Sequence, residues 1–100
     1  MRSNRNPPLP GPLLDQILDK WGSGIAELRL QVIELRLRPS QYFDVHKHIA
    51  NFRVTDVGNK GWKYYEVTTK GQYGRRMFKG YIRDAGRGTW EHSATRPMIT

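Results

Sequence analysis

The stretch that decides the fold is Arg75-Arg76-Met77-Phe78-Lys79-Gly80-Tyr81-Ile82-Arg83. In a β-strand, successive side chains point to opposite faces of the sheet. One face of such a strand would carry Phe78, Gly80 and Ile82, and the other would carry Arg75, Met77, Lys79, Tyr81 and Arg83. The first set suits a hydrophobic core, whereas cations beside a tyrosine suit an exposed surface. The stretch therefore predicts a strand with one buried face and one basic, aromatic face that could bind a polyanion.

Turns before this strand place it in a β-meander that begins near Phe52. Residues 58–61 (Gly-Asn-Lys-Gly) and 71–74 (Gly-Gln-Tyr-Gly) carry the glycines typical of turns. Treating each as a four-residue loop predicts a register that pairs Phe52 with Val67, Arg53 with Glu66, Val54 with Tyr65, Tyr64 with Tyr81, Tyr65 with Gly80, Glu66 with Lys79, and Val67 with Phe78. These cross-strand pairs are chemically compatible. A third turn at residues 86–88 predicts a fourth strand, with Trp90 beside Arg83 and Glu91 opposite Ile82.

The clearest helix is predicted over residues 12–21. Proline suits the first position of a helix, and Gly22 suits the position just after its end. One face of this helix would carry the apolar side chains Leu13, Leu14, Ile17, Leu18 and Trp21.

Residues 25–38 favour a strand, with a helix as the alternative. Apolar residues alternate with polar ones in two runs, and the phase changes between Val32 and Ile33. One β-bulge in a long strand would explain that change, whereas a helix would leave Leu30 and Leu37 poorly placed. After this element, Ser40 is predicted to cap a second helix that runs to about Ala50.

The predicted fold class is α+β in one small domain, because 100 residues suffice for one domain. Residues 12–92 form this domain: an N-terminal helix, a strand, a second helix, and a three- to four-stranded antiparallel meander with helices on one face. Residues 1–11 are interpreted as a proline-rich extended arm and residues 93–100 as a C-terminal tail.

The chain is basic, with a formal net charge of +8 and a pI of about 10.2. Residues 75–100 hold six Lys and Arg against two Asp and Glu, which is half of that net charge. Such a balance favours nucleic acid or an acidic surface as partner. The sequence shows neither the roughly 20 apolar residues of a membrane span nor an apolar signal core, so we expect a soluble, cytoplasmic protein without a membrane partner.

The sequence contains few of the residue types and spacings that bind a metal or a cofactor. The chain has no cysteine, which excludes disulfides and zinc sites built on thiolates. His46 and His48 lie two residues apart, but no acidic cluster completes a set of ligands. We therefore expect no metal, no cofactor and no assigned catalytic residue.

The leading hypothesis is a small, basic, non-enzymatic accessory protein that binds nucleic acid through one face of its sheet. Cations that follow phosphates, interleaved with aromatic rings that stack on bases, are typical of single-stranded DNA or RNA sites. The predicted binding residues are Arg53, Lys60, Tyr64, Lys70, Arg75, Lys79, Tyr81, Arg83, Arg87 and Trp90. Glu66 argues against this hypothesis, because its charge dilutes the positive field of the same face.

Two alternatives remain at this stage. One is a viral-type structural or inhibitory protein, found in the virion, that binds an acidic protein surface through the proline-rich arm and the same sheet face. Under either hypothesis, the arm is also a candidate contact between subunits of an oligomer. The other is a metal-independent ribonuclease, in which a cation stabilises the phosphorane and His92 or a tyrosine acts as acid or base.

Overall fold

The computed structural model describes residues 11–97, and it places the helices before the sheet in the chain. The elements are α1 (Gly11–Trp21), α2 (Ala26–Leu37), α3 (Val45–His48), β1 (Ile49–Asp56), β2 (Lys63–Thr69), the short 3-10 helix η1 (Gly71–Tyr73), β3 (Met77–Gly86) and β4 (Thr89–Ser93). The predicted α+β class is confirmed. The predicted arm, apart from its last residue, lies outside the described part of the chain.

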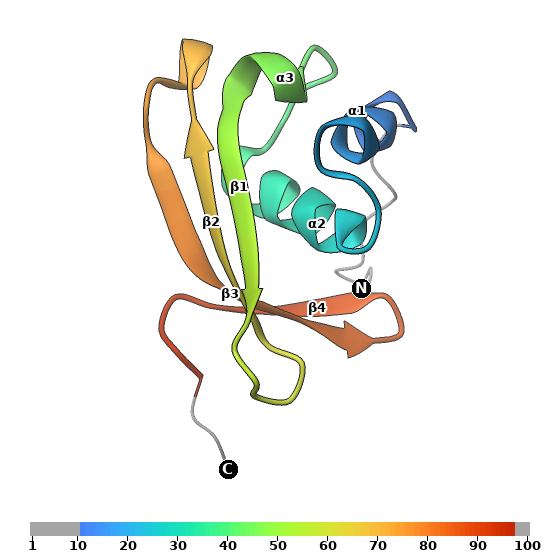
Figure 1. Ribbon diagram of the computed structural model, residues 1–100, viewed down its shortest axis with the longest axis vertical. Helices are drawn as coiled ribbons and strands as arrows, with labels where there is room; N and C mark the ends of the chain where they lie inside the picture. The colour runs from blue at the N-terminus through green and yellow to red at the C-terminus, as the bar shows by residue number, and fades with distance from the viewer. Residues whose placement is uncertain (1–10, 98–100) are drawn as a thin grey trace.

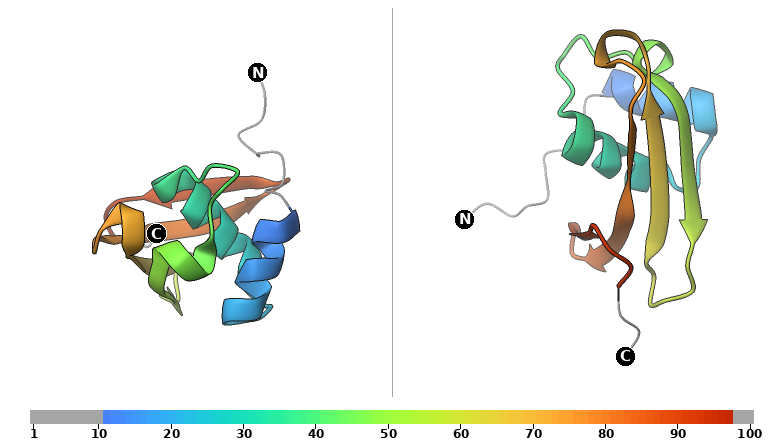
Figure 2. Two further views of the ribbon diagram at one scale, coloured as in Figure 1. Left: turned by 90° about the horizontal axis from the view of Figure 1, so that it is seen from above. Right: turned by 90° about the vertical axis from the view of Figure 1, so that its left-hand side faces the viewer.

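The four strands form one antiparallel sheet in the order β1-β2-β3-β4. The three helices cover one face of this sheet and leave the other face open, as Figures 1 and 2 show. The first half of β3 pairs with β2 and its second half pairs with β4, so β4 crosses beneath the helices at a steep angle to β1 in Figure 1. The open face is the only large surface of β1–β3 on which the helices do not lie.

The register predicted from the two glycine-bounded loops is confirmed at every pair. Phe52, Arg53 and Val54 face Val67, Glu66 and Tyr65 across β1 and β2. On the other side of β2, the partners on β3 are Tyr81 for Tyr64, Gly80 for Tyr65, Lys79 for Glu66 and Phe78 for Val67. Each face of the sheet therefore carries the side chains that the alternation assigned to it.

The hydrophobic core lies between the helices and the inner face of the sheet. Its fully buried apolar side chains come from every layer: Ile17 of α1, Val32 and Ile33 of α2, Val45 of α3, Ile49 of β1, Tyr65 and Val67 of β2, and Ile82 of β3. The confirmed helix α1 ends with Trp21, whose ring meets the edge of Phe52 at a centroid distance of 5.6 Å. This packing fixes the sheet against the helices, so the open face is held by a rigid support.

The strand prediction for residues 25–38 is wrong, because Ala26–Leu37 form helix α2. The buried positions of α2 are Ala26, Arg29, Val32, Ile33 and Leu37, which follow the helical period. Because this buried stripe contains an arginine and the exposed face carries Leu35, the positions of the apolar residues alone do not reveal the helical period. The Arg29 guanidinium packs against the rings of both Trp21 and Phe52, at 5.2 and 5.3 Å from their centroids.

The predicted helix from Ser40 to Ala50 is reduced to the single turn α3. Ser40 caps only a turn, in which its hydroxyl and carbonyl oxygens accept from the amides of Tyr42 and Phe43. Asp44 is the true N-cap and accepts from the amide of His46 at 2.9 Å. The chain becomes extended at Ile49 because β1 begins there and pairs with β2.

The predicted register of the β3–β4 hairpin is wrong by one residue. The turn consists of Arg87 and Gly88, both with positive φ (55° and 73°), a combination typical of two-residue type I′ turns. An irregularity between Asp84 and Gly86 then shifts the pairing, so that Ile82 faces His92 and Asp84 faces Trp90. Trp90 therefore lies on the helix-covered face and does not lie beside Arg83.

Candidate nucleic-acid interface on the open sheet face

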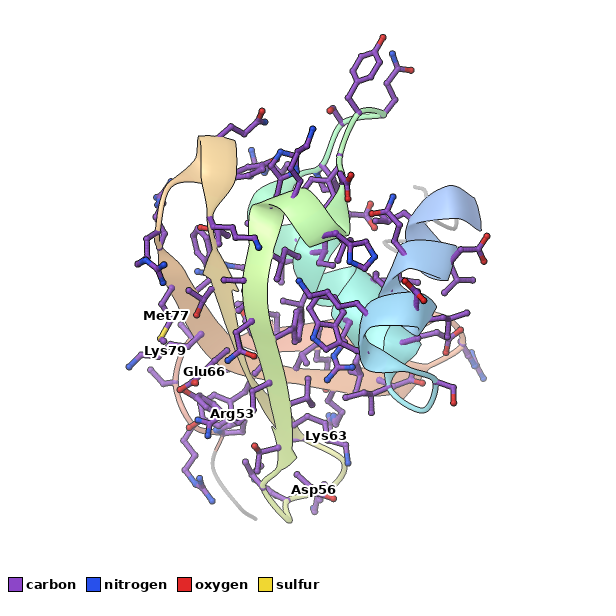
Figure 3. The ribbon with its side chains drawn as sticks, turned by 45° about the horizontal axis from the view of Figure 1, so that its top comes forward. Arg53, Asp56, Lys63, Glu66, Met77 and Lys79 are labelled. Atoms are coloured by element: carbon purple, nitrogen blue, oxygen red, sulfur yellow. The ribbon has the colours of Figure 1, made fainter. Side chains whose placement is uncertain are left out.

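A row of three charged residues crosses the open face from β1 to β3. Arg53 faces Glu66, and Glu66 faces Lys79, so cation, anion and cation follow one another across three strands. Figure 3 shows these side chains, with Met77 nearby, on the side of the sheet away from the helices. The Arg53 guanidinium bonds the Glu66 carboxylate at 3.0 Å, whereas Lys79 forms no ion pair within residues 11–97. The Lys79 ammonium is therefore available for an anionic ligand.

A pair of tyrosines lies beside this row. The rings of Tyr64 and Tyr81 face each other across β2 and β3 with centroids 5.3 Å apart and planes tilted by 54°. The Tyr64 hydroxyl donates to Glu66 at 2.7 Å, and this hydrogen bond raises the pKa of the Tyr64 hydroxyl. Glu66 thus holds both Arg53 and Tyr64, which fixes the orientation of one ring and one guanidinium on the open face.

The tyrosine pair and the two cations of the charged row, Arg53 and Lys79, line a groove of about 520 Å³. Its lining residues are Arg53, Thr55, Val57, Tyr64, Lys79, Gly80, Tyr81, Ala94, Thr95 and Arg96. The volume lies within the range of about 300–1,000 Å³ that is typical of ligand clefts. The floor is the sheet, and one wall is the segment 94–96 that follows β4.

This wall is anchored at both of its ends. The Ser93 hydroxyl donates to the carbonyl of Thr95 at 2.5 Å and accepts from the Thr95 amide at 3.2 Å. The side-chain amide of the buried Asn59 donates to the carbonyl of Pro97 at 3.3 Å. The wall adds Arg96 to the cations of the groove, a residue that was not predicted because the sequence interpretation placed the tail outside the domain.

Arg83 lies on the open face, but its guanidinium already contacts other residues of the protein. Its guanidinium lies over the ring of Trp62 at 5.0 Å, forms a salt bridge with Glu91, and donates to the carbonyl of Lys60 at 3.3 Å. These contacts join the β1–β2 turn to the β3–β4 hairpin. Arg83 is therefore best explained as a structural residue, and the exposed Lys60 lies in the turn next to it.

The remaining predicted cations are scattered around the sheet. Arg75 is exposed in the loop before β3, and Arg87 is exposed in the β3–β4 turn. Lys70 lies at the end of the sheet near α3, because its amide donates to the carbonyl of His48 at 2.8 Å. The Lys20 pKa is lowered by burial and then by the charge of Lys70, so Lys70 lies on the helix side and outside the groove.

The helix-covered face carries a separate polar cluster that the sequence did not reveal as a unit. Arg36 of α2 donates to the hydroxyl of the fully buried Tyr65 at 2.9 Å, and this hydroxyl lies 2.7 Å from Nε2 of His92. Gly80 lies beneath these groups, and a Cβ there would stand 2.8 Å from the Tyr65 oxygen. A hollow of about 320 Å³ adjoins the cluster between α2 and the β3–β4 hairpin, with His92 and Trp90 in its lining.

This cluster bears on the ribonuclease alternative. His92, the proposed acid or base, lies on the opposite face from the groove cations, and its Nε2 contacts a buried hydroxyl. Burial and the charge of Arg36 lower the His92 pKa, which favours a neutral ring. The predicted phosphate-binding residues therefore do not converge on His92.

Residues 11–97 also lack two features that would bear on function. They contain no group of three or more His, Cys, Asp or Glu side chains arranged to hold a metal ion, and no helix with the length and apolar character to cross a membrane. Asp56, for example, pairs with Lys63 at 3.1 Å beside the β1–β2 turn, away from Glu66 (Figure 3). Comparisons of the chain with protein-family models, curated proteins and solved structures give no match.

Proposed function

We propose that the protein binds single-stranded nucleic acid in the groove on the open face of its sheet. The observation that carries the proposal is the Tyr64–Tyr81 ring pair, set in a groove of about 520 Å³ that Arg53, Lys79 and Arg96 also line. Aromatic rings stack on bases of any sequence, and nearby cations neutralise the phosphates that connect them. The proposed role is non-enzymatic and cytoplasmic, as the sequence led us to expect.

The shape of the site favours a single strand over a duplex. Bases must be unstacked from their neighbours to lie on a tyrosine ring, and this is cheap only in single strands, loops and ends. The groove is bounded by the segment 94–96 on one side, so its floor accepts a flat base more readily than a double helix. Either DNA or RNA satisfies these requirements.

Salt dependence of binding tests the proposal directly. We take the groove cations with the exposed Arg75 as four phosphate contacts: Arg53, Arg75, Lys79 and Arg96. With a slope of about −0.7 per phosphate for single strands, raising salt from about 50 to about 200 mM should weaken binding roughly 50-fold. The measurement is fluorescence anisotropy with a labelled strand of about eight nucleotides and with the matching duplex. Affinity for neither, or affinity independent of salt, would overturn the proposal.

A further inference from the structure

Glu66 is the one anion of the charged row, and its position needs an explanation in a site for polyanions. Its side chain is 23% exposed and lies beside the groove, next to the lining residues Arg53, Tyr64 and Lys79. One oxygen accepts from Arg53 at 3.0 Å and the other accepts from Tyr64 at 2.7 Å. An ionised carboxylate offers about four lone-pair sites on two oxygens, so each oxygen keeps capacity for one more donor.

We infer that Glu66 selects guanine among the bases that the groove binds, an inference that rests on the proposed function. A base stacked on Tyr81 would direct one edge along the strands toward the Glu66–Lys79 pair, since residues two apart on a strand are separated by about 6.6 Å. Guanine alone presents two adjacent donors, N1–H and N2–H₂, which match the two remaining acceptor positions of the carboxylate. Its O6 acceptor lies next to those donors and suits the Lys79 ammonium.

The other bases fit this pair less well. Uracil offers one donor between two carbonyl oxygens, so one carbonyl would face the carboxylate. Cytosine and adenine each place a ring-nitrogen acceptor beside their amino group. The two hydrogen bonds from Arg53 and Tyr64 hold Glu66 in place, so the carboxylate does not turn away from a mismatched base. Glu66 would therefore give the groove base preference at some cost in general affinity for phosphate.

The experiment uses five RNA strands of about eight nucleotides, each of uridine with one central position changed to guanine, inosine, adenine or cytosine or left as uracil. We expect the guanine strand to bind the full chain about 10-fold tighter than the uridine strand, in the lower part of the range for a bidentate side chain–base pair. The inosine strand, which lacks only the N2 amino group, should fall between them. The ratio of guanine-strand to uridine-strand affinity should fall below about 3-fold in Glu66→Gln.

Asp84→Asn is the matched control. It removes the same charge from an exposed side chain on the other face, and the amide oxygen can still accept from the Gly86 amide as Asp84 does at 2.8 Å. This variant should keep the guanine preference, and its loss there would overturn the inference. Equal, salt-sensitive binding of all five strands would overturn the inference and leave the proposed function standing. Failure of every strand to bind would overturn both.

Discussion

The hydroxyl of Tyr65 lies 2.7 Å from Nε2 of His92, beneath the helices. Arg36 carries only donors and bonds the same hydroxyl oxygen at 2.9 Å. In the neutral tautomer that carries its hydrogen on Nδ1, His92 offers Nε2 as acceptor for the hydroxyl hydrogen, a role that Arg36 cannot fill. Protonation of His92 would remove the acceptor and leave a buried hydroxyl hydrogen without a partner, which is unfavourable.

The first prediction concerns the pH dependence of stability. Burial and the charge of Arg36 lower the His92 pKa below its ordinary value of 6.5, so the unfolded chain takes up this proton more readily than the folded one. The contribution of His92 to the free energy of unfolding should be complete above about pH 6.5. It should decrease as the pH falls from there toward the folded-state pKa.

Urea unfolding of the unaltered chain and of His92→Gln, between pH 7.5 and pH 5, provides the measurement. The variant lacks the titrating ring, so its free energy of unfolding should fall less over this interval. Parallel curves for the two proteins would show that His92 does not carry the effect.

The second prediction concerns Gly80, whose missing side chain makes room for the Tyr65 hydroxyl. A Cβ at this position would lie 2.8 Å from the Tyr65 oxygen and 3.0 Å from Nε2 of His92. Gly80→Ala should therefore lower the free energy of unfolding by about 1–3 kcal/mol, the usual cost of overpacking. A double-mutant cycle with Tyr65→Phe checks the cause, since removing the hydroxyl should relieve much of that cost. Additive effects would argue against the clash.

The third prediction concerns Tyr81 as a stacking platform. Tyr81→Ala should weaken binding of a single strand by about 1–3 kcal/mol, or roughly 5- to 150-fold, while Tyr81→Phe should retain most of the affinity. Tyr42→Ala is the matched control, because Tyr42 is 80% exposed in the loop before α3 and lies outside the groove. Anisotropy titrations give the affinities. Equal losses in Tyr81→Ala and Tyr42→Ala would contradict a specific role for the groove.

The fourth prediction concerns Lys79 as a phosphate contact. With a uridine strand, which has no guanine O6 for Lys79 to bond, Lys79→Gln should reduce the slope of log affinity against log salt by about 0.7, the value for one phosphate on a single strand. Lys47→Gln removes an equally exposed cation from α3, on the other side of the molecule, and should leave the slope almost unchanged. Since Lys79 is exposed, thermal unfolding of the variant should match that of the unaltered chain.

The sheet was predictable because its loops and its alternation agree with each other. Two glycine-bounded loops set the register, and that register brought Arg53, Glu66 and Lys79 into one row and Tyr64 beside Tyr81. Local turn chemistry and a period of two were sufficient there. The same logic failed at the β3–β4 hairpin, where an irregularity after Asp84 moved Trp90 to the covered face, a change that composition does not signal.

Helix α2 was not the preferred prediction for its residues, and the groove wall was not predicted at all. The reasons differ. The buried stripe of α2 includes Arg29, whose guanidinium packs against two aromatic rings from other elements. Arg96 reaches the groove through the hydrogen bonds of Ser93 and Asn59, which connect distant parts of the chain. Long-range contacts complete both features, and the helical period of α2 was too mixed in composition to be preferred over a strand.

The covalent continuity of β4 with the groove wall has a thermodynamic consequence. His92 belongs to β4, which ends at Ser93, and the wall begins at the next residue, Ala94. A strand of nucleic acid that needs this wall would bind only when β4 is paired, so it would stabilise the paired state by mass action. Amide hydrogens of β4 should then exchange with solvent more slowly when the groove is filled. The exchange rates of the β4 amides would therefore report whether the groove on the open face is filled.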